Sequence, residues 1–362
     1  MKNRLLHIIS LWMLCLMLPA CSDYLQEMMM LDSSIRVSLG ISTRAVEQEG
    51  KEVGNGLPQS LKVWIYGVKD NEETLLAYIS QVASEGSAIF NDGTDLYGNP
   101  VEVIERELER GKEYEKLNFY VVLNDGAVTW SQGASLDENT TSTALRAMTF
   151  NFPTPITYTN DNEQLMYGES TLDIIASKTN YDVEIPAERT VAKLELFFTK
   201  RDIDKVLVIN SVKMESDVNK GYLLEQQELN DIYADSNVET TLFTNLENSG
   251  SIDCASTEEY GNFSKDEKNF KLLVSSFLLE NPIGLDWKEE TEVYPGSEDE
   301  IAHAYKVMLN YTYDGVTKDV SFYLPKVERN VLTKIYVRIR DLSWEVDVFP
   351  YTGVVLEPEF GL

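Results

Sequence analysis

Short segments of alternating or continuous apolar residues, separated by turn residues, recur along the chain and predict β-strands. In the segment 61–66 the side chains of Leu61, Val63 and Ile65 share one face, as expected of a half-buried strand. Asp314-Gly315 separates two alternating runs, and this dipeptide favours a tight hairpin turn. The segments that fit a strand are 61–66, 75–79, 119–123, 191–198, 270–279, 307–313, 316–324 and 333–340.

Helical patterns are short by comparison. Residues 142–148 allow one or two helical turns, and residues 102–110 are ambiguous. Many short strands with turn residues between them are typical of β-sandwiches. The chain of 362 residues is long enough for two domains. A polar stretch that ends near Ile185–Glu188, followed by a new strand, places the expected domain boundary there.

The N-terminus has the composition of a secretory signal. Lys2 and Arg4 give a basic start, and Pro19-Ala20-Cys21 directly follows the mostly apolar segment 5–18. The apolar stretch is shorter than the roughly 20 residues of a membrane-spanning helix. A cysteine directly after a small residue indicates a lipobox, in which the thiol of Cys21 receives a diacylglycerol before cleavage. The alternative is an ordinary signal peptide in which the cysteine stands by chance.

Charge and cysteine content restrict the partners and the chemistry. Loss of Lys2 and Arg4 with the signal changes the formal net charge from −29 to −31. This acidity argues against nucleic acid as a partner, because phosphates require a basic surface. Of the three cysteines, Cys15 leaves with the signal and Cys21 takes the lipid. Cys254 is then a single thiol, expected to be free and buried, and no intramolecular disulfide is expected.

Apolar and polar residues alternate between the expected lipid site and the first domain. Thr43-Arg44-Ala45 follows this predicted strand, and an arginine in a loop beside a strand is accessible to an arginine-specific protease. Cleavage between Arg44 and Ala45 would release the lipid and the strand together. The open groove would then bind another strand by β-strand addition. The apolar residues that share one face of the predicted strand are Ile35, Val37, Leu39 and Ile41.

The segment after Trp344 is a candidate for that replacement strand. Pro350 and Pro358 argue against a central strand of a regular sheet, since proline donates no ladder hydrogen bond. Spacing alone leaves two interpretations open, a donor strand for a neighbouring subunit or a C-terminal strand packed on its own domain. The apolar residues of one parity in this tail are Val354, Leu356 and Phe360.

Enzymatic and metal-binding chemistry have little support. After His7 is lost with the signal, His303 is the only histidine, and a lone histidine beside a strand is more often structural than catalytic. Neither a zinc-binding Cys–His cluster nor a glycine-rich phosphate loop is present. Paired carboxylates for glycoside cleavage stay open, because no pair stands out among 60 acidic residues. The acidic segments 289–300 and 91–95 lack EF-hand spacing and are interpreted as solvated loops, and Trp287 as structural rather than sugar-stacking.

A series of motifs spans nearly the whole chain in a fixed order. They are the lipobox at Cys21, Thr43-Arg44-Ala45, Leu61–Tyr66, Phe119–Asn124, Leu165–Glu169, Glu188–Lys193, Phe277–Pro282, Arg329–Tyr336, and Trp344 with its tail. In this order they resemble the fimbrillins, the lipoprotein pilus subunits of Bacteroidales-type bacteria. The chain departs from the family pattern at Leu123 and Tyr167, where smaller residues are expected, and at Phe349-Pro350-Tyr351, where Pro-Trp is more usual.

The resemblance implies an all-β protein with two transthyretin-like β-sandwich domains in tandem, anchored in the outer membrane by its lipid and without a cofactor. It further implies cleavage after Arg44 by an arginine-specific protease and strand exchange with other fimbrial subunits, identical or related. The implied segments are a signal peptide (1–20), a lipidated propeptide with the displaceable strand (21–44), two sandwiches (45–187 and 188–345) and a donor-strand tail (346–362).

Two functions therefore stay open. The first is a structural subunit of a cell-surface fimbria that supports adhesion. The second is an uncleaved, lipid-anchored binding module or fimbrial anchor subunit, which keeps its N-terminal strand and can hold a host or bacterial surface ligand. The presence of both Arg44 and a long C-terminal tail favours the first.

Overall fold

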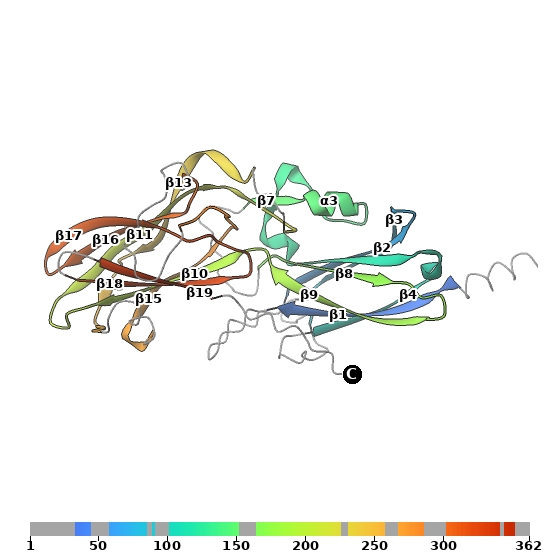
Figure 1. The fold of residues 1–362 in the computed structure, drawn as a ribbon, viewed down its shortest axis with the longest axis horizontal. Helices are drawn as coiled ribbons and strands as arrows, with labels where there is room; N and C mark the ends of the chain where they lie inside the picture. Colours follow the sequence, from blue (N-terminus) through green and yellow to red (C-terminus); the bar gives the residue numbers. More distant parts are fainter. Residues whose placement is uncertain are drawn as a thin grey trace, which may run out of the picture.

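The computed structural model describes residues 33–44, 58–84, 89–90, 101–151, 164–225, 231–257, 267–285, 302–340 and 344–351. Strands dominate this part of the chain and form two β-sandwich bodies that lie end to end along the long axis (Figure 1). The prediction of an all-β protein with two β-sandwiches in tandem is confirmed. No helix within the described ranges is long and apolar enough to cross a membrane.

The first sandwich is a seven-stranded sheet folded over on itself. Strands β8 and β9 share only two residue pairs, Met166 with Arg189 and Tyr167 with Glu188, and the sheet bends there. Apolar side chains from both sides of the bend enclose one core between the two layers. In spatial order the strands are β3 (Glu72–Val82), β2 (Ser60–Lys69), β5 (Lys116–Leu123), β8 (Met166–Asp173), β9 (Asn180–Arg189), β1 (Ile35–Arg44) and β4 (Val101–Leu108).

The second sandwich packs a four-stranded sheet on a five-stranded one, with a separate apolar core between them. The first of these sheets contains β15 (Lys271–Leu278), β10 (Ala192–Lys200), β18 (Leu332–Ile339) and β19 (Trp344–Tyr351). The second contains β13 (Tyr233–Thr244), β11 (Leu207–Val218), β16 (Lys306–Tyr313) and β17 (Val316–Tyr323), with β14 (Ser251–Ile252) beside β11. The chain passes from the first sandwich to the second between Arg189 and Ala192, a few residues beyond the expected boundary.

A small sheet and an apolar cluster join the two bodies. Strand β12 (Lys220–Tyr222) of the second body pairs with β7 (Thr149–Asn151), which also pairs with β6 (Thr129–Trp130) of the first. Trp64 and Tyr120 pack in one cluster with Leu223 and Leu279 across this junction.

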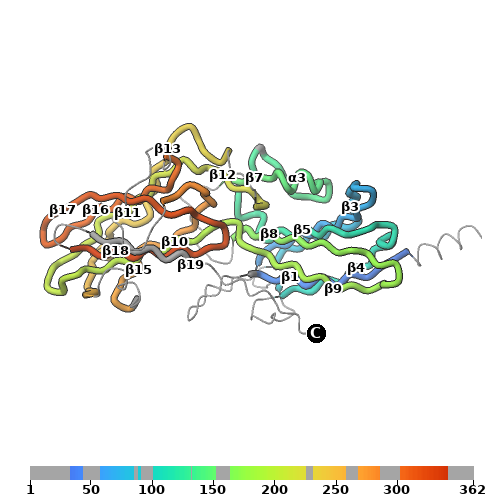
Figure 2. Tube along the Cα trace, viewed as in Figure 1, coloured from blue at the N-terminus to red at the C-terminus, as the bar shows by residue number. Residues whose placement is uncertain are grey.

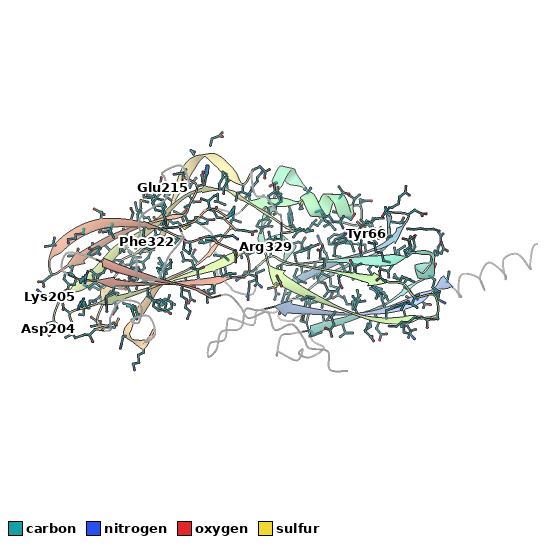
Figure 3. The ribbon with its side chains drawn as sticks, in the orientation of Figure 1. Tyr66, Asp204, Lys205, Glu215, Phe322 and Arg329 are labelled. Atoms are coloured by element: carbon teal, nitrogen blue, oxygen red, sulfur yellow. The ribbon has the colours of Figure 1, made fainter. Side chains whose placement is uncertain are left out.

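The guanidinium of Arg329 holds the segment beside β12 in place (Figure 3). It donates to Glu280 Oε2 at 3.0 Å and to the carbonyl oxygens of Tyr222 and Leu223 at 3.2 Å each. The backbone N–H of Leu223 in turn donates to the carbonyl oxygen of Met148 in the first body, at 2.9 Å. The two sandwiches therefore meet through backbone pairing, an apolar cluster and a charged anchor.

Local sequence accounts for the hairpins and the single described α-helix. Asp70 and Asn71 adopt positive φ values of 52° and 65° between β2 and β3, and Asp314 and Gly315 adopt 49° and 85° between β16 and β17. The helix α3 (Ser142–Ala147) begins after Thr141, whose hydroxyl accepts the backbone N–H of Ala144 at 3.1 Å. The predicted hairpin at Asp314-Gly315 and the predicted short helix are confirmed.

Candidate functional site

Strand β1 is an interior strand of the first sandwich, although it comes from the N-terminal segment of the chain (Figure 2). It runs antiparallel to β4, from the pair Ile35–Leu108 to the pair Ser42–Val101. On its other side it runs parallel to β9, from the pair Arg36–Asn180 to the pair Arg44–Glu188. Both edges of β1 are thus paired, and its removal would leave an open groove between β4 and β9, each with an unpaired edge.

The alternating side chains of β1 are divided between core and surface. The four apolar side chains on the inner face, Ile35, Val37, Leu39 and Ile41, are 1%, 0%, 0% and 0% exposed and belong to the core of the first sandwich. On the outer face Arg36 is exposed, and Ser38 and Ser42 are half-buried. Burial of one such apolar side chain contributes about 1.5–3 kcal/mol, so the four contribute roughly 6–12 kcal/mol. The apolar inner face therefore adds substantially to what the two backbone ladders contribute to holding the strand.

The two ends of β1 lie at opposite ends of the first sandwich. At its beginning, the hydroxyl of Ser33 donates to the carbonyl oxygen of Glu109 at 2.9 Å, and the N–H of Arg36 donates to the carbonyl oxygen of Thr179 at 2.7 Å. At its other end, Arg44 is the last residue of β1 and pairs with Glu188 on β9. The expectation that Arg44 lies in a loop after the strand is therefore wrong, because the pairing with β9 continues past Ile41 to Arg44. The expected cleavage position thus coincides with the end of the ladder, close to the junction between the bodies. Ala45 lies outside the described residues.

The other residues expected to take part in export and exchange lie mainly outside the described ranges. These are Cys21, Val354, Leu356 and Phe360. The acidic segments 91–95 and 289–300 and Trp287, to which no part in export or exchange is assigned, lie outside the described ranges too. The beginning of the C-terminal tail is described as β19, which pairs antiparallel with β18 from Ile339–Trp344 to Leu332–Tyr351. Leu332 also pairs with Lys193 at the start of β10, so β19 ends near the junction as well. The segment 344–351 is thus a strand on its own domain, at the edge of the four-stranded sheet.

His303 lies in a polar cluster of the second sandwich. Its Nδ1 is hydrogen-bonded to Oδ2 of the buried Asp217 on β11, and its ring stacks on Tyr233 at 4.2 Å between centroids. Its carbonyl oxygen accepts from Nδ2 of the fully buried Asn281 at 2.8 Å. These contacts connect β11, β13 and the segment before β16. Within the described residues, no group of three or more His, Cys, Asp or Glu side chains is arranged to hold a metal ion.

Cys254 is a free, half-buried thiol. Its Sγ donates to the carbonyl oxygen of Phe198 at 3.6 Å, and burial raises the pKa of the thiol. A thiol with a raised pKa carries little of the nucleophilic thiolate near neutral pH. Its place beside β10 fits a packing role.

The sequence pattern predicts β1 but not the strands on either side of it. The segment 102–110 fits either a helix or a strand by its pattern, and the structure has β4 over Val101–Leu108. Strand β9 (Asn180–Arg189) also alternates, with Tyr181, Val183 and Ile185 buried. This alternation predicts a half-buried strand at 180–189, but it does not indicate that the strand pairs with β1 in parallel.

Comparison with known proteins yields matches only among solved structures. No protein-family model matches the chain, and no curated protein matches it. A putative cell adhesion protein from Bacteroides eggerthii is 13% identical, with a TM-score of 0.49 over 87% of this chain and 95% of the other. A fimbrial assembly protein from Parabacteroides distasonis is 14% identical, with a TM-score of 0.49 over 88% and 98%. The tip fimbrial protein Mfa3 from Porphyromonas gingivalis is 14% identical, with a TM-score of 0.48 over 87% and 99%.

Proposed function

We propose that this chain is a structural subunit of a cell-surface fimbria that supports adhesion, exported as a lipoprotein, cleaved after Arg44 and polymerised by β-strand exchange. The observation that carries the proposal is the position of β1. The segment that precedes Arg44 supplies an interior strand, and its inner face is completely buried.

The connection after Arg44 determines whether β1 can leave. In the uncut chain β1 is tethered to its own groove, so its effective concentration there is high, on the order of millimolar for a short linker. After cleavage it is held only by hydrogen bonds and by the roughly 6–12 kcal/mol from its four apolar side chains. Its departure exposes the edges of β4 and β9, and such edges bind another extended segment.

The C-terminal tail is the proposed donor. Because β19 is paired with β18, the tail is anchored to its own subunit as far as Tyr351, and the residues beyond it supply the donor strand. Val354, Leu356 and Phe360 would replace the inward-facing side chains of β1. A slip of one residue would turn the polar face of the donor inward, so the register has to be kept.

The test follows assembly with an arginine-specific protease. Wild type should form polymers after cleavage, whereas Arg44→Ala should remain a folded monomer. Arg36→Ala is the matched control, because Arg36 lies on the same strand but points to solvent; this variant should assemble like wild type. A chain that ends at Gly353 should be cleaved but should add no subunits, as followed by gel filtration. If the shortened chain polymerises like wild type, the proposed donor is wrong.

A second function fits the complete sandwich of the uncut chain. With β1 in place, the first body has a closed core and needs no strand from another subunit. An uncleaved chain would suit an anchor subunit or a lipid-anchored binding module. N-terminal sequencing of the protein recovered from cells decides between the two, since a mature terminus at Ala45 indicates the polymerising subunit and a blocked terminus at Cys21 indicates the anchor.

A further inference from the structure

A buried glycine, Gly111, lies at the end of the groove where Ile35 packs. Gly111 is buried in the turn between β4 and β5, directly against the first inward-facing side chain of β1. A β-carbon on Gly111 would lie 2.3 Å from Cγ1 and 2.5 Å from Cδ1 of Ile35. Carbon atoms in van der Waals contact are about 3.5–4.0 Å apart. Ile35 therefore occupies space that any other residue at position 111 would fill.

The backbone does not explain the glycine. Positive φ values that favour glycine occur at Gly133 and Gly315, but Gly111 is not among the glycines with positive φ. An alanine could adopt the conformation of Gly111, and only the proximity of Ile35 opposes it. Among the described glycines, Gly111 is the one at which a β-carbon would meet a β1 side chain.

The other inward-facing positions of β1 have different surroundings. Leu39 pairs with Ile104 on β4 and Val183 on β9, so its ladder neighbours are branched side chains. The space at Gly111 is thus a local recess at one end of the groove, and it distinguishes Ile35 from the other three positions. A slip of one residue would bring Ser34 or the charged Arg36 to this recess.

We propose that Gly111 is the specificity-determining residue of the β1 groove. It requires a large apolar side chain at the corresponding position of any strand that fills the groove, and it thereby fixes the register. This inference rests on the proposed strand exchange where it concerns a foreign strand. The same size requirement acts on Ile35 within the uncut chain, where it can be measured separately.

The first experiment measures thermal unfolding of the full uncut chain. Gly111→Ala and Ile35→Ala should each lower Tm by several degrees, since a core change of this kind shifts Tm by about 2–4 °C per kcal/mol in a body of this size. In the double variant the added methyl group enters the space vacated by Ile35, so its Tm should be no lower than that of Ile35→Ala alone. Gly126→Ala is the matched control, because nothing lies within 4 Å of its β-carbon position.

The expected coupling is specific to Ile35. Combining Gly111→Ala with Leu39→Ala should give additive losses, because the two sites share no space. If Gly111→Ala lowers Tm equally with isoleucine and with alanine at position 35, the recess does not select the side chain and the proposal is wrong. The double variant keeps this test valid even if Gly111→Ala alone fails to fold.

The second experiment measures exchange in the chain cleaved after Arg44. Labelled peptides of residues 33–44, with Ile35 or with alanine in its place, compete for the groove. Wild type should bind the Ile35 peptide at least about thirtyfold more tightly than the alanine peptide, as expected for loss of a buried isoleucine. The Gly111→Ala variant should lose or reverse this preference. Equal binding of both peptides by wild type overturns the role of Gly111 but leaves strand exchange intact. If neither peptide enters, strand exchange is wrong, and the size requirement at Gly111 is decided by the unfolding data.

Discussion

Replacing Leu39 by alanine tests how β1 is held. Leu39 is fully buried in the core of the first sandwich, between its ladder partners Ile104 and Val183. Substitution of a buried leucine by alanine destabilises a protein by about 2–5 kcal/mol through lost apolar contact and the remaining cavity. In the uncut chain this loss should appear as a lower urea midpoint. Ser38→Ala, on the outer face of the same strand, should change stability by less than about 0.5 kcal/mol.

The same substitution should act on strand release after cleavage. Once Arg44 is cut, the lost free energy weakens binding of β1 to its groove, and about 2–5 kcal/mol corresponds to a factor of roughly 30 to 4,000 in the dissociation constant. A fluorophore on the N-terminal fragment reports its release by anisotropy. If Leu39→Ala destabilises the uncut chain as expected but the fragment binds as tightly as in wild type, the apolar side chains do not hold β1 and the reasoning fails.

Three further predictions concern other parts of the molecule. Cys21→Ala should abolish metabolic palmitate labelling and surface retention, and unchanged labelling would contradict the lipobox. Arg329→Ala should destabilise the chain by about 3 kcal/mol in thermal unfolding, because it leaves Glu280 without its partner at the junction; Glu280→Gln should be milder. Burial raises the pKa of Tyr66 and of Tyr120 to about 12, whereas the pKa of a tyrosine in an unfolded chain is about 10. Their contribution to stability should be full below pH 10 and be lost as the pH rises to 12, and replacing both by phenylalanine should flatten the urea midpoint over that range.

Local patterns in the sequence predict the strands whose two faces differ in burial. The alternation from Ile35 to Ile41 predicts a buried inner face because successive side chains of a strand point in opposite directions. The hairpin at Asp314-Gly315 is equally local, since both residues tolerate the positive φ that a tight turn requires. Such features depend only on residues that are neighbours in the sequence, so the sequence alone is enough to predict them.

Strand β4 shows where local patterns become ambiguous. Only Ile104 and Leu108 are buried in it, and a spacing of four residues places two side chains on the same face in a helix as well as in a strand. The position between them holds the exposed Arg106, so the expected alternation is interrupted. The charges suit an edge strand, because they discourage pairing with another sheet. The reason for these charged residues is therefore evident only once β4 is known to be an edge strand of the sheet.

The junction and the recess depend on contacts between residues far apart in the chain. Strands β7 and β12 contain three residues each, too few for a periodic pattern, and they pair because the two bodies meet there. The role of Gly111 follows only from its position against Ile35. A single sequence records the residue types at these positions but not their proximity.

The direction of β1 also determines how the protein bears mechanical force. β1 lies roughly along the long axis of the molecule (Figure 1), and its N-terminal end is Ile35. Tension on a membrane anchor ahead of Ile35 would pull the strand lengthwise, across ladder hydrogen bonds that lie largely transverse to it. Under this shear load many bonds and all four buried side chains resist together, whereas peeling from the Arg44 end would break one residue pair at a time. An anchored precursor would therefore withstand traction, and an incoming strand that starts at the cut end would meet the weaker direction.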